Sequence, residues 1–221
     1  MDIEKADAIL QKLWDRDAAA WREHWVPIFR KFARDLAGDA NLKTGQILLD
    51  VGTGTGIAAM DALKYVRPGG IVLGIDRSDP ILKLAEIEHA NLRNVCFLKM
   101  NSERLIFPNG LFDVVISNCG ISPTAFRGTV AEIFRVLRRG GSLTFNDWHL
   151  IDVPVHRVFS EILRTHRTNR PSKKLKAIRM ALGTSEHAGN RFGGQSVYFL
   201  VCVHEQGHDS VLLLSPLGGI I

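Results

Sequence analysis

A glycine-rich turn and a carboxylate downstream of it are the residues best placed to do chemistry. Residues 47–56 read Ile-Leu-Leu-Asp-Val-Gly-Thr-Gly-Thr-Gly, and a second apolar run, residues 71–76, ends in Asp76. Glycines let a backbone turn tightly and approach a ligand, because they have no Cβ. A carboxylate at the next strand end accepts hydrogen bonds from both hydroxyls of a ribose. The pattern predicts a βαβ unit that holds a nucleoside-type cofactor.

The spacing of the glycines separates two classes of cofactor. Dinucleotide-binding proteins use G-x-G-x-x-G, with a pyrophosphate at the helix N-terminus. This chain has G-x-G-x-G, preceded by Asp50. A carboxylate there suits a cationic amino-acid group better than a pyrophosphate. The alternative is a purely structural turn, which the intact order of strand, turn, helix, strand and acid disfavours.

The turn resembles motif I of class I S-adenosylmethionine (SAM) dependent methyltransferases. The resemblance continues through residues 97–108, similar to the segment that borders the adenine, residues 111–118, similar to the fourth strand, and residues 133–145. It covers roughly residues 45 to 150 and is closest to the ubiquinone/menaquinone-biosynthesis subgroup (methyltransferase type 11), which acts mostly on small molecules. The resemblance implies SAM as the cofactor and leaves the acceptor open, because substrates vary widely within the subgroup.

The resemblance also implies which residues contact the cofactor. They are Asp50, Gly52, Thr53, Gly54, Gly56, Asp76, Arg77, Asn101, Ser102, Glu103 and Asn118. One position departs from the family, since the subgroup usually has Asp where this chain has Asn101. In the family that side chain accepts a hydrogen bond from the adenine amino group, and the oxygen of an Asn amide can still accept. We expect cofactor binding to survive at a lower affinity.

Strand-like and helix-like segments alternate along the chain. Short apolar runs at residues 46–51, 71–75, 95–99, 113–118 and 141–147 are typical of parallel strands covered on both faces, and helices are expected at about 55–66, 79–90 and 125–138. Residues 196–203 and 210–215 indicate a hairpin. The sequence predicts an α/β fold: a doubly wound, seven-stranded, mostly parallel sheet of the Rossmann-like class I methyltransferase type, ending in a C-terminal antiparallel hairpin.

The chain is interpreted as a single SAM-dependent methyltransferase domain over residues 1–221. Its expected parts are an N-terminal helical cap (1–40), a cofactor-binding core (45–150), a basic helical insert (151–195) and the terminal hairpin (196–215). Residues 3–36 are expected to be helical with a break near Pro27.

Aromatic side chains gather in the expected cap. An apolar stripe contains Ile9, Leu13, Ala20 and Trp21, with Trp14 nearby. Packing of this stripe onto the core is one interpretation. The other is that Trp14 and Trp21 contact the substrate, together with Cys119 beside the expected cleft. For Cys119 the alternative is a small packing residue.

Composition favours a cytoplasmic protein. Hydrophobic residues make up 46% and charged residues 23%, no apolar run reaches membrane-spanning length, and the N-terminus does not read as a signal peptide. Three scattered cysteines favour reduced thiols, and the dispersed histidines predict no metal site. The net charge of +5 fits an anionic substrate or surface.

Residues 155–182 are strongly basic, with eight Arg or Lys residues against Glu161. A solvated helix face is the simplest interpretation, and an anionic substrate, a nucleic acid or a membrane surface are the alternatives. Interleaved aromatic residues, which would support base stacking, are absent from this stretch of sequence.

Methyl transfer from a sulfonium is a direct displacement, so the protein mainly positions the nucleophile and excludes water. A base is needed only when the nucleophile must lose a proton, and His149 and His24 are the candidates, each with an ordinary structural histidine as its alternative. The Asn/Asp-Pro-Pro-aromatic motif of many amine methyltransferases is missing after the fourth strand. The sequence predicts transfer to oxygen or carbon of a small organic acceptor. An RNA methyltransferase that uses residues 155–182, and a non-catalytic SAM-binding module, are the alternatives.

Overall fold

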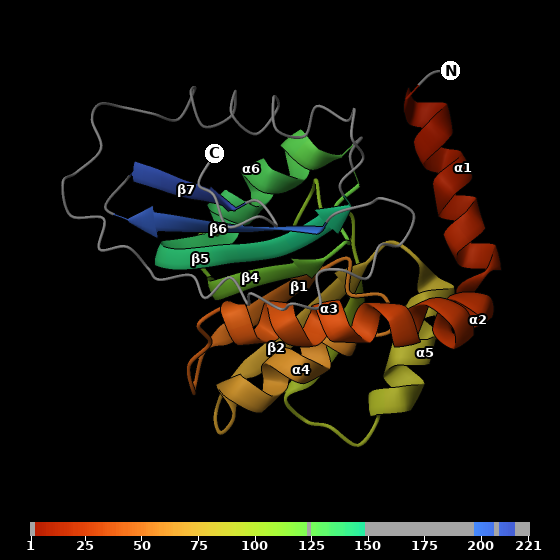
Figure 1. The fold of residues 1–221 in the computed structure, drawn as a ribbon, viewed down its shortest axis with the longest axis horizontal. Helices are drawn as coiled ribbons and strands as arrows, with labels where there is room; N and C mark the ends of the chain where they lie inside the picture. The colour runs from red at the N-terminus through yellow and green to blue at the C-terminus, as the bar shows by residue number, and fades with distance from the viewer. Residues whose placement is uncertain (1–2, 123–124, 149–196, 206–207, 215–221) are drawn as a thin grey trace.

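The computed structural model describes residues 3–122, 125–148, 197–205 and 208–214. Helices and strands alternate through its central part. In chain order they are β1 (Ile47–Val51), α4 (Ile57–Val66), β2 (Ile71–Asp76), α5 (Asp79–His89), β3 (Val95–Lys99), β4 (Phe112–Asn118), α6 (Phe126–Val136) and β5 (Leu137–Trp148). The expected alternation is confirmed (Figure 1).

The strands form one sheet in the order β3-β2-β1-β4-β5-β6-β7. The first five strands in that order pair in parallel. The strand β6 (Val197–Glu205) runs antiparallel to β5, and β7 (His208–Leu214) runs antiparallel to β6. The chain order reverses between β1 and β4, which is the point where such sheets bind ligands beyond their carboxyl ends. The five parallel strands confirm a Rossmann-like α/β fold.

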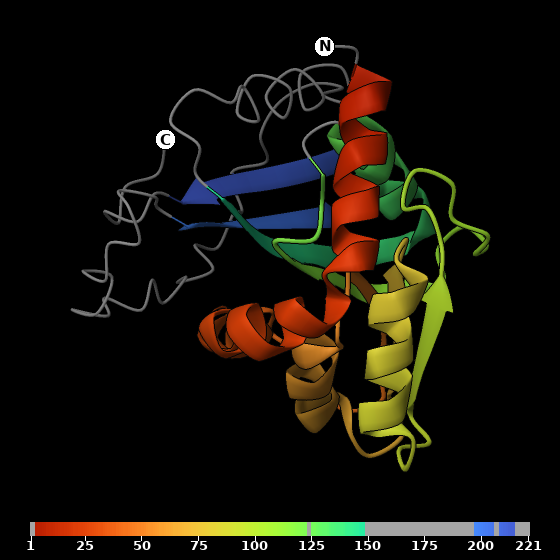
Figure 2. The same ribbon diagram turned by 90° about the vertical axis from the view of Figure 1, so that its right-hand side faces the viewer.

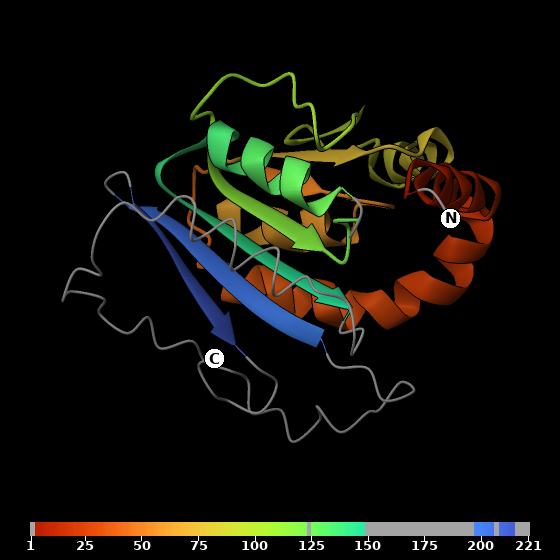
Figure 3. The same cartoon turned by 90° about the horizontal axis from the view of Figure 1, so that it is seen from above.

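Each face of the sheet has its own hydrophobic core, because side chains alternate along a strand. Val115 belongs to the cluster that packs under α6, whereas Val114 and Ile116 belong to the cluster under α3 (Val26–Asp39) and α4. Figure 3 shows α6 and α3 on opposite sides of the sheet. The sheet is therefore covered on both faces, as the continuous apolar runs predicted.

The beginning of β5 differs from the sequence expectation. The predicted strand began at residue 141, after a Gly-Gly turn, but β5 begins at Leu137 directly after α6. Leu137 pairs with Phe112, and the pairing resumes with Ser142 opposite Val114. The residues between them form an irregularity within the strand. Gly140 has a φ of +77°, so the glycine that suggested a turn serves this bulge instead.

The N-terminal segment has four parts. The helix α1 (Ile3–Arg16) is followed by α2 (Ala18–Ala20), by the π-helical turn η1 (Trp21–Trp25) and by α3. The irregular turn precedes Pro27, which occupies the first turn of α3, where its missing N–H does no harm. Figures 1 and 2 show α1 beyond the carboxyl ends of β4 and β5, close to α5.

The apolar stripe of α1 does not pack onto the core. Ile9 is 51% exposed, and Leu13 and Trp14 are 40% and 42% exposed. The reason is geometric, because α1 contacts α5 and stands away from both faces of the sheet (Figure 2). For these side chains, the interpretation that the stripe packs onto the core is wrong.

Candidate functional site

The three glycines of the turn have different surroundings. All three adopt left-handed backbone angles, with φ of +69°, +56° and +83° at Gly52, Gly54 and Gly56. A Cβ on Gly52 would lie 2.4 Å from the Cα of Gly120, and a Cβ on Gly56 would lie 2.7 Å from the ring of Phe97. Gly52 and Gly56 are therefore required by the packing of the protein itself.

Gly54 differs, because a Cβ placed there would meet its neighbours only at ordinary van der Waals distance. The atoms nearest to a Cβ placed there are Nε1 of Trp21 at 3.9 Å and a methyl carbon of Ile81 at 4.0 Å. Trp21 lies in η1, and its ring stacks on Phe29 with centroids 5.2 Å apart. Of the three glycines, Gly54 is therefore the one whose Cβ position the described residues do not block, and an indole nitrogen lies next to that position.

Asp50 lies beneath the turn and is fully buried. Its Oδ2 accepts hydrogen bonds from the hydroxyl of Thr53, at 2.7 Å, and from the N–H of Ala59, at 3.1 Å. Its Oδ1 is buried and has no hydrogen-bond partner among the described residues. Burial raises the pKa of Asp50 to about 7; the two hydrogen bonds oppose this rise, and the charge of Asp76 adds to it.

Asp76 ends β2 and contacts the same turn. Its Oδ2 accepts a hydrogen bond from the N–H of Gly54, and its Oδ1 accepts one from the N–H of Ser78, each at 3.0 Å. Burial raises the pKa of Asp76, and hydrogen bonds from backbone N–H groups, including that of Arg77, lower it. A carboxylate has about four acceptor positions, so Asp76 keeps acceptor capacity for ribose hydroxyls.

The segment after β3 carries the next three predicted residues. Asn101 is exposed, and its Oδ1 accepts a hydrogen bond from the N–H of Glu103 at 3.0 Å. The hydroxyl of Ser102 lies 2.7 Å from that of Thr129 in α6. The backbone N–H of Met100 bonds to the carbonyl of Asp76 at 2.8 Å, so this segment begins beside the β2 end.

The end of β4 holds two further predicted residues. Asn118 has a buried Oδ1 without a hydrogen-bond partner in the described part of the chain. Cys119 follows in a left-handed conformation, with φ of +55°, which is unusual for a residue other than glycine. Its thiol donates to Oδ1 of Asn146 at 3.4 Å. Such backbone geometry clusters at functional sites.

Asn146 lies beside two of the predicted site residues, Asn118 and Cys119, and sequence reasoning missed it. It is buried in β5, pairs in register with Asn118, and its amide donates to the carbonyl of Phe32 at 3.5 Å. Two asparagines at adjacent strand ends were visible in the sequence. Only the register of β4 against β5 brings them together.

The weaker sequence candidates have different outcomes. Trp14 packs edge-on against Trp21, with centroids 4.7 Å apart, so it supports the ring that lies near Gly54. His24 is exposed on η1. His149 and the whole 151–195 insert, including its basic segment 155–182, lie outside the described residues. Within the described residues there is no cluster of His, Cys, Asp or Glu that could hold a metal ion, and no helix long and apolar enough to cross a membrane.

Comparison with known proteins identifies the central part of the chain. A family model described as a methyltransferase domain matches residues 48–141, which contain the glycine turn, Asp76 and the Asn101 segment. The chain carries a class I SAM-dependent methyltransferase domain. The matched range runs from the second residue of β1, through β4 and α6, to the beginning of β5, so this domain contains the switch point of the sheet.

Named relatives of this methyltransferase domain act on different molecules. A demethylmenaquinone methyltransferase of Lactococcus lactis is 34% identical over 122 residues, or 54% of this chain and 48% of the relative. A nocamycin O-methyltransferase of Saccharothrix syringae is 35% identical over 134 residues, or 59% of this chain and 48% of the relative. The chain spans about half the length of these curated relatives.

The fold is also found in solved structures. The YcgJ protein of Bacillus subtilis shares 25% identity with this chain, with a TM-score of 0.51 over 61% of this chain and 58% of that one. The fold of this chain is therefore similar to one seen in a crystal structure.

Proposed function

We propose that this protein transfers a methyl group from SAM to a small organic acceptor, at oxygen or carbon. The observation that carries the proposal is the surroundings of Gly54. A Cβ on Gly54 would meet no atom closer than 3.9 Å, and the N–H of Gly54 donates to Asp76. Asp50 lies beneath the turn with one buried oxygen unpartnered among the described residues. A buried acceptor without a partner is costly unless a donor satisfies it.

The chemistry of these groups matches the parts of SAM. Asp50 would face the positively charged amino group, Asp76 would accept hydrogen bonds from the ribose hydroxyls, and Asn101 would face the adenine. Thr53, Arg77, Ser102 and Glu103 would complete the contacts from the same two segments. SAM supplies an activated methyl group when it is bound, so the work of the chain is to bind, orient and exclude water.

The acceptor would bind beside Trp21, between the N-terminal helices and residues 150–195. Trp21, supported by Trp14, offers an apolar wall next to the glycine turn. Cys119 and Asn118 at the end of β4 would form the opposite wall. The relatives include a demethylmenaquinone methyltransferase and a nocamycin O-methyltransferase, and these names support a small molecule as the acceptor. The basic insert would favour an anionic one.

The proposal extends to the whole chain. We take residues 1–221 as one domain whose sheet β6 and β7 complete. We place the protein in the cytoplasm, where its scattered cysteines would stay reduced.

The test is binding followed by turnover. Calorimetry with SAM and with S-adenosylhomocysteine (SAH) should show one saturable site, and a panel of phenols, quinols, carboxylic acids and a total RNA sample should reveal which addition produces SAH. Binding without SAH production from any of them favours a non-catalytic SAM-binding module. Methylation of the RNA, with a steep salt dependence, would replace the small-molecule acceptor with a nucleic acid. Absence of SAM binding would refute the proposal.

A further inference from the structure

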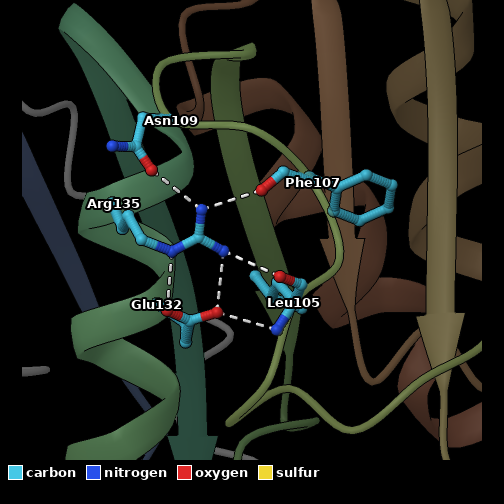
Figure 4. A network of polar contacts seen from close by, with 5 residues as sticks. All are labelled: Leu105, Phe107, Asn109, Glu132 and Arg135. Atoms are coloured by element: carbon cyan, nitrogen blue, oxygen red, sulfur yellow. Dashed lines mark hydrogen bonds and ion pairs between the residues drawn. The ribbon is translucent and has the colours of Figure 1, made fainter.

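One face of α6 holds an irregular segment of the chain, residues 101–110, in a fixed register. Arg135 donates from Nε and Nη2 to the two carboxylate oxygens of Glu132, at 2.7 and 2.8 Å. It also donates to the carbonyls of Leu105 and Phe107, both at 2.8 Å, and to Oδ1 of Asn109 at 2.9 Å. Figure 4 shows this single guanidinium reaching three residues of the segment.

Glu132 also binds the segment directly. Its Oε2 accepts a hydrogen bond from the N–H of Leu105 at 2.7 Å, while Arg135 takes the carbonyl of the same residue. The backbone of Leu105 is therefore paired on both sides, as it would be in a strand. The adjacent guanidinium lowers the pKa of Glu132, so this carboxylate is ionised at neutral pH.

The contacts continue along the segment in both directions. Toward its beginning, the hydroxyl of Thr129 meets that of Ser102 at 2.7 Å. A Cβ on Gly128 would lie 2.8 Å from Oε1 of Glu103, so the helix and the segment are in close contact at this point as well. Toward its end, the carbonyl of Arg135 accepts from the N–H of Gly110 at 3.0 Å. The helix residues involved are spaced by one, three and three positions and so share one face of α6.

From these contacts we propose that Glu132 and Arg135 are positioning residues that hold Asn101 at the adenine end of the cofactor site. The inference rests on the proposed function, because it assigns Asn101 to the adenine. Glu132 and Arg135 would fix the position of residues 101–110 along α6. The segment runs between β3 and β4 without regular structure of its own, so α6 determines where its first residues stand relative to Asp76.

A stability role alone does not account for the arrangement. The side chains of Arg135 and Glu132 are 31% and 21% exposed, and partly exposed ion pairs contribute little to the free energy of folding. The fork of Arg135 instead satisfies several acceptors at fixed angles, which is a geometric function that a lysine cannot reproduce.

The experiment compares SAH affinity and thermal stability across matched variants. Arg135→Met removes the fork and keeps the apolar stem, Arg135→Lys keeps the charge, and Glu132→Gln tests the partner. Arg138→Met is the control, because Arg138 pairs with Asp113 at the other end of β4. We expect Arg135→Met to raise the Kd of SAH about 10-fold, the scale of losing charge-assisted hydrogen bonds, with Arg135→Lys intermediate and Arg138→Met within about twofold.

A double-mutant cycle separates positioning from general loosening. If Arg135 acts through Asn101, then Arg135→Met has little further effect on the Kd in an Asn101→Ala background. Multiplicative losses in the two backgrounds would overturn the inference, and so would an unchanged Kd in a folded Arg135→Met protein. Should Arg135→Met fail to fold, the same cycle is run with Glu132→Gln. If the wild-type protein does not bind SAH, the proposed function and this role are both refuted. If it binds SAH and the two substitutions raise the Kd multiplicatively, this role alone is refuted.

Discussion

Nε1 of Trp21 lies 3.9 Å from the point that a Cβ on Gly54 would occupy. This relationship joins the N-terminal helices to the glycine turn. The ion pair between Arg22 and Glu88 fastens the same turn of helix to α5. A ligand placed against the backbone of Gly54 would therefore have an indole as its neighbour, and the first prediction follows from this contact.

Gly54→Ala should abolish measurable SAH binding while the protein stays folded. The new methyl group meets no atom closer than 3.9 Å, so its main cost in the free protein is the left-handed backbone, about 1–2 kcal/mol. The methyl group would occupy the space of the ligand. Calorimetry and thermal unfolding measure the two effects. Gly52→Ala is the contrasting variant and should fail to fold, and normal SAH binding by Gly54→Ala would make the loop a purely structural turn.

Trp21→Ala should lower kcat/KM for the methyl acceptor at least 10-fold, roughly the value of a buried aromatic contact. Trp25→Ala is the matched control, because Trp25 is another tryptophan of this segment, is 44% exposed and stacks on the ring of Trp21. Steady-state kinetics and SAH calorimetry are compared for both variants. Equal effects of the two substitutions would remove Trp21 from the acceptor site.

Asp76→Ala should weaken SAH binding by about 1–3 kcal/mol, because ribose hydroxyls would lose their acceptor. Asp79→Ala serves as the control, since Asp79 is exposed and its carboxylate pairs with Lys99. Calorimetry gives the difference. An unchanged affinity in a folded Asp76→Ala protein would contradict the ribose assignment.

The affinity for SAH should rise with pH up to about 7, because burial raises the pKa of Asp50 to about 7. A cationic amino group prefers the ionised carboxylate, so binding below this pKa requires loss of a proton from Asp50. The expected slope is up to about one tenfold change per pH unit between pH 5.5 and 6.5. Asp50→Asn should bind more weakly and without this slope. A slope that survives in Asp50→Asn would assign it to another group.

The free energy of unfolding of the free protein should depend on pH in the opposite direction to the affinity for SAH. A carboxyl whose pKa is raised by folding binds more protons in the folded state, so its stabilising contribution is present below about pH 4 and is lost as pH rises toward 7. The difference in unfolding free energy between the wild type and Asp50→Asn should change in this direction between pH 5 and 7. Chemical denaturation at several pH values measures it, and a pH-independent difference would show that Asp50 does not titrate in this range.

The sequence predicted the sheet well because its strands are short apolar runs bounded by glycines and acids. Leu48 and Val72 are in strands for that reason, and both are fully buried. The start of β5 was mispredicted because a glycine pair serves a turn and a bulge equally well. The position of α1 stayed open, because an apolar stripe shows which face of a helix is apolar and does not show what covers that face.

Sequence reasoning selected residues around the glycine turn without showing what each of them contacts. The sequence presents the three glycines as equivalent, and only the approach of Gly120 and Phe97 shows that two of them serve packing. The partners of the 101–110 segment are equally hidden, because Arg135 lies 30 residues from Leu105 in the chain. Long-range contacts of this kind depend on the packing of α6, which no local pattern encodes.

The contact between Gly52 and Gly120 sets a limit on how this domain can change. A Cβ on Gly52 would lie 2.4 Å from the Cα of Gly120, and a Cβ on Gly120 would lie 2.5 Å from the carbonyl oxygen of Val51. Neither obstacle is a side chain, so neither can be made smaller by a second substitution. A variant that has lost either glycine could be repaired only by moving the backbone. Selection for suppressor mutations should therefore return revertants to glycine here, and laboratory evolution of new acceptor preferences will have to proceed around this pair.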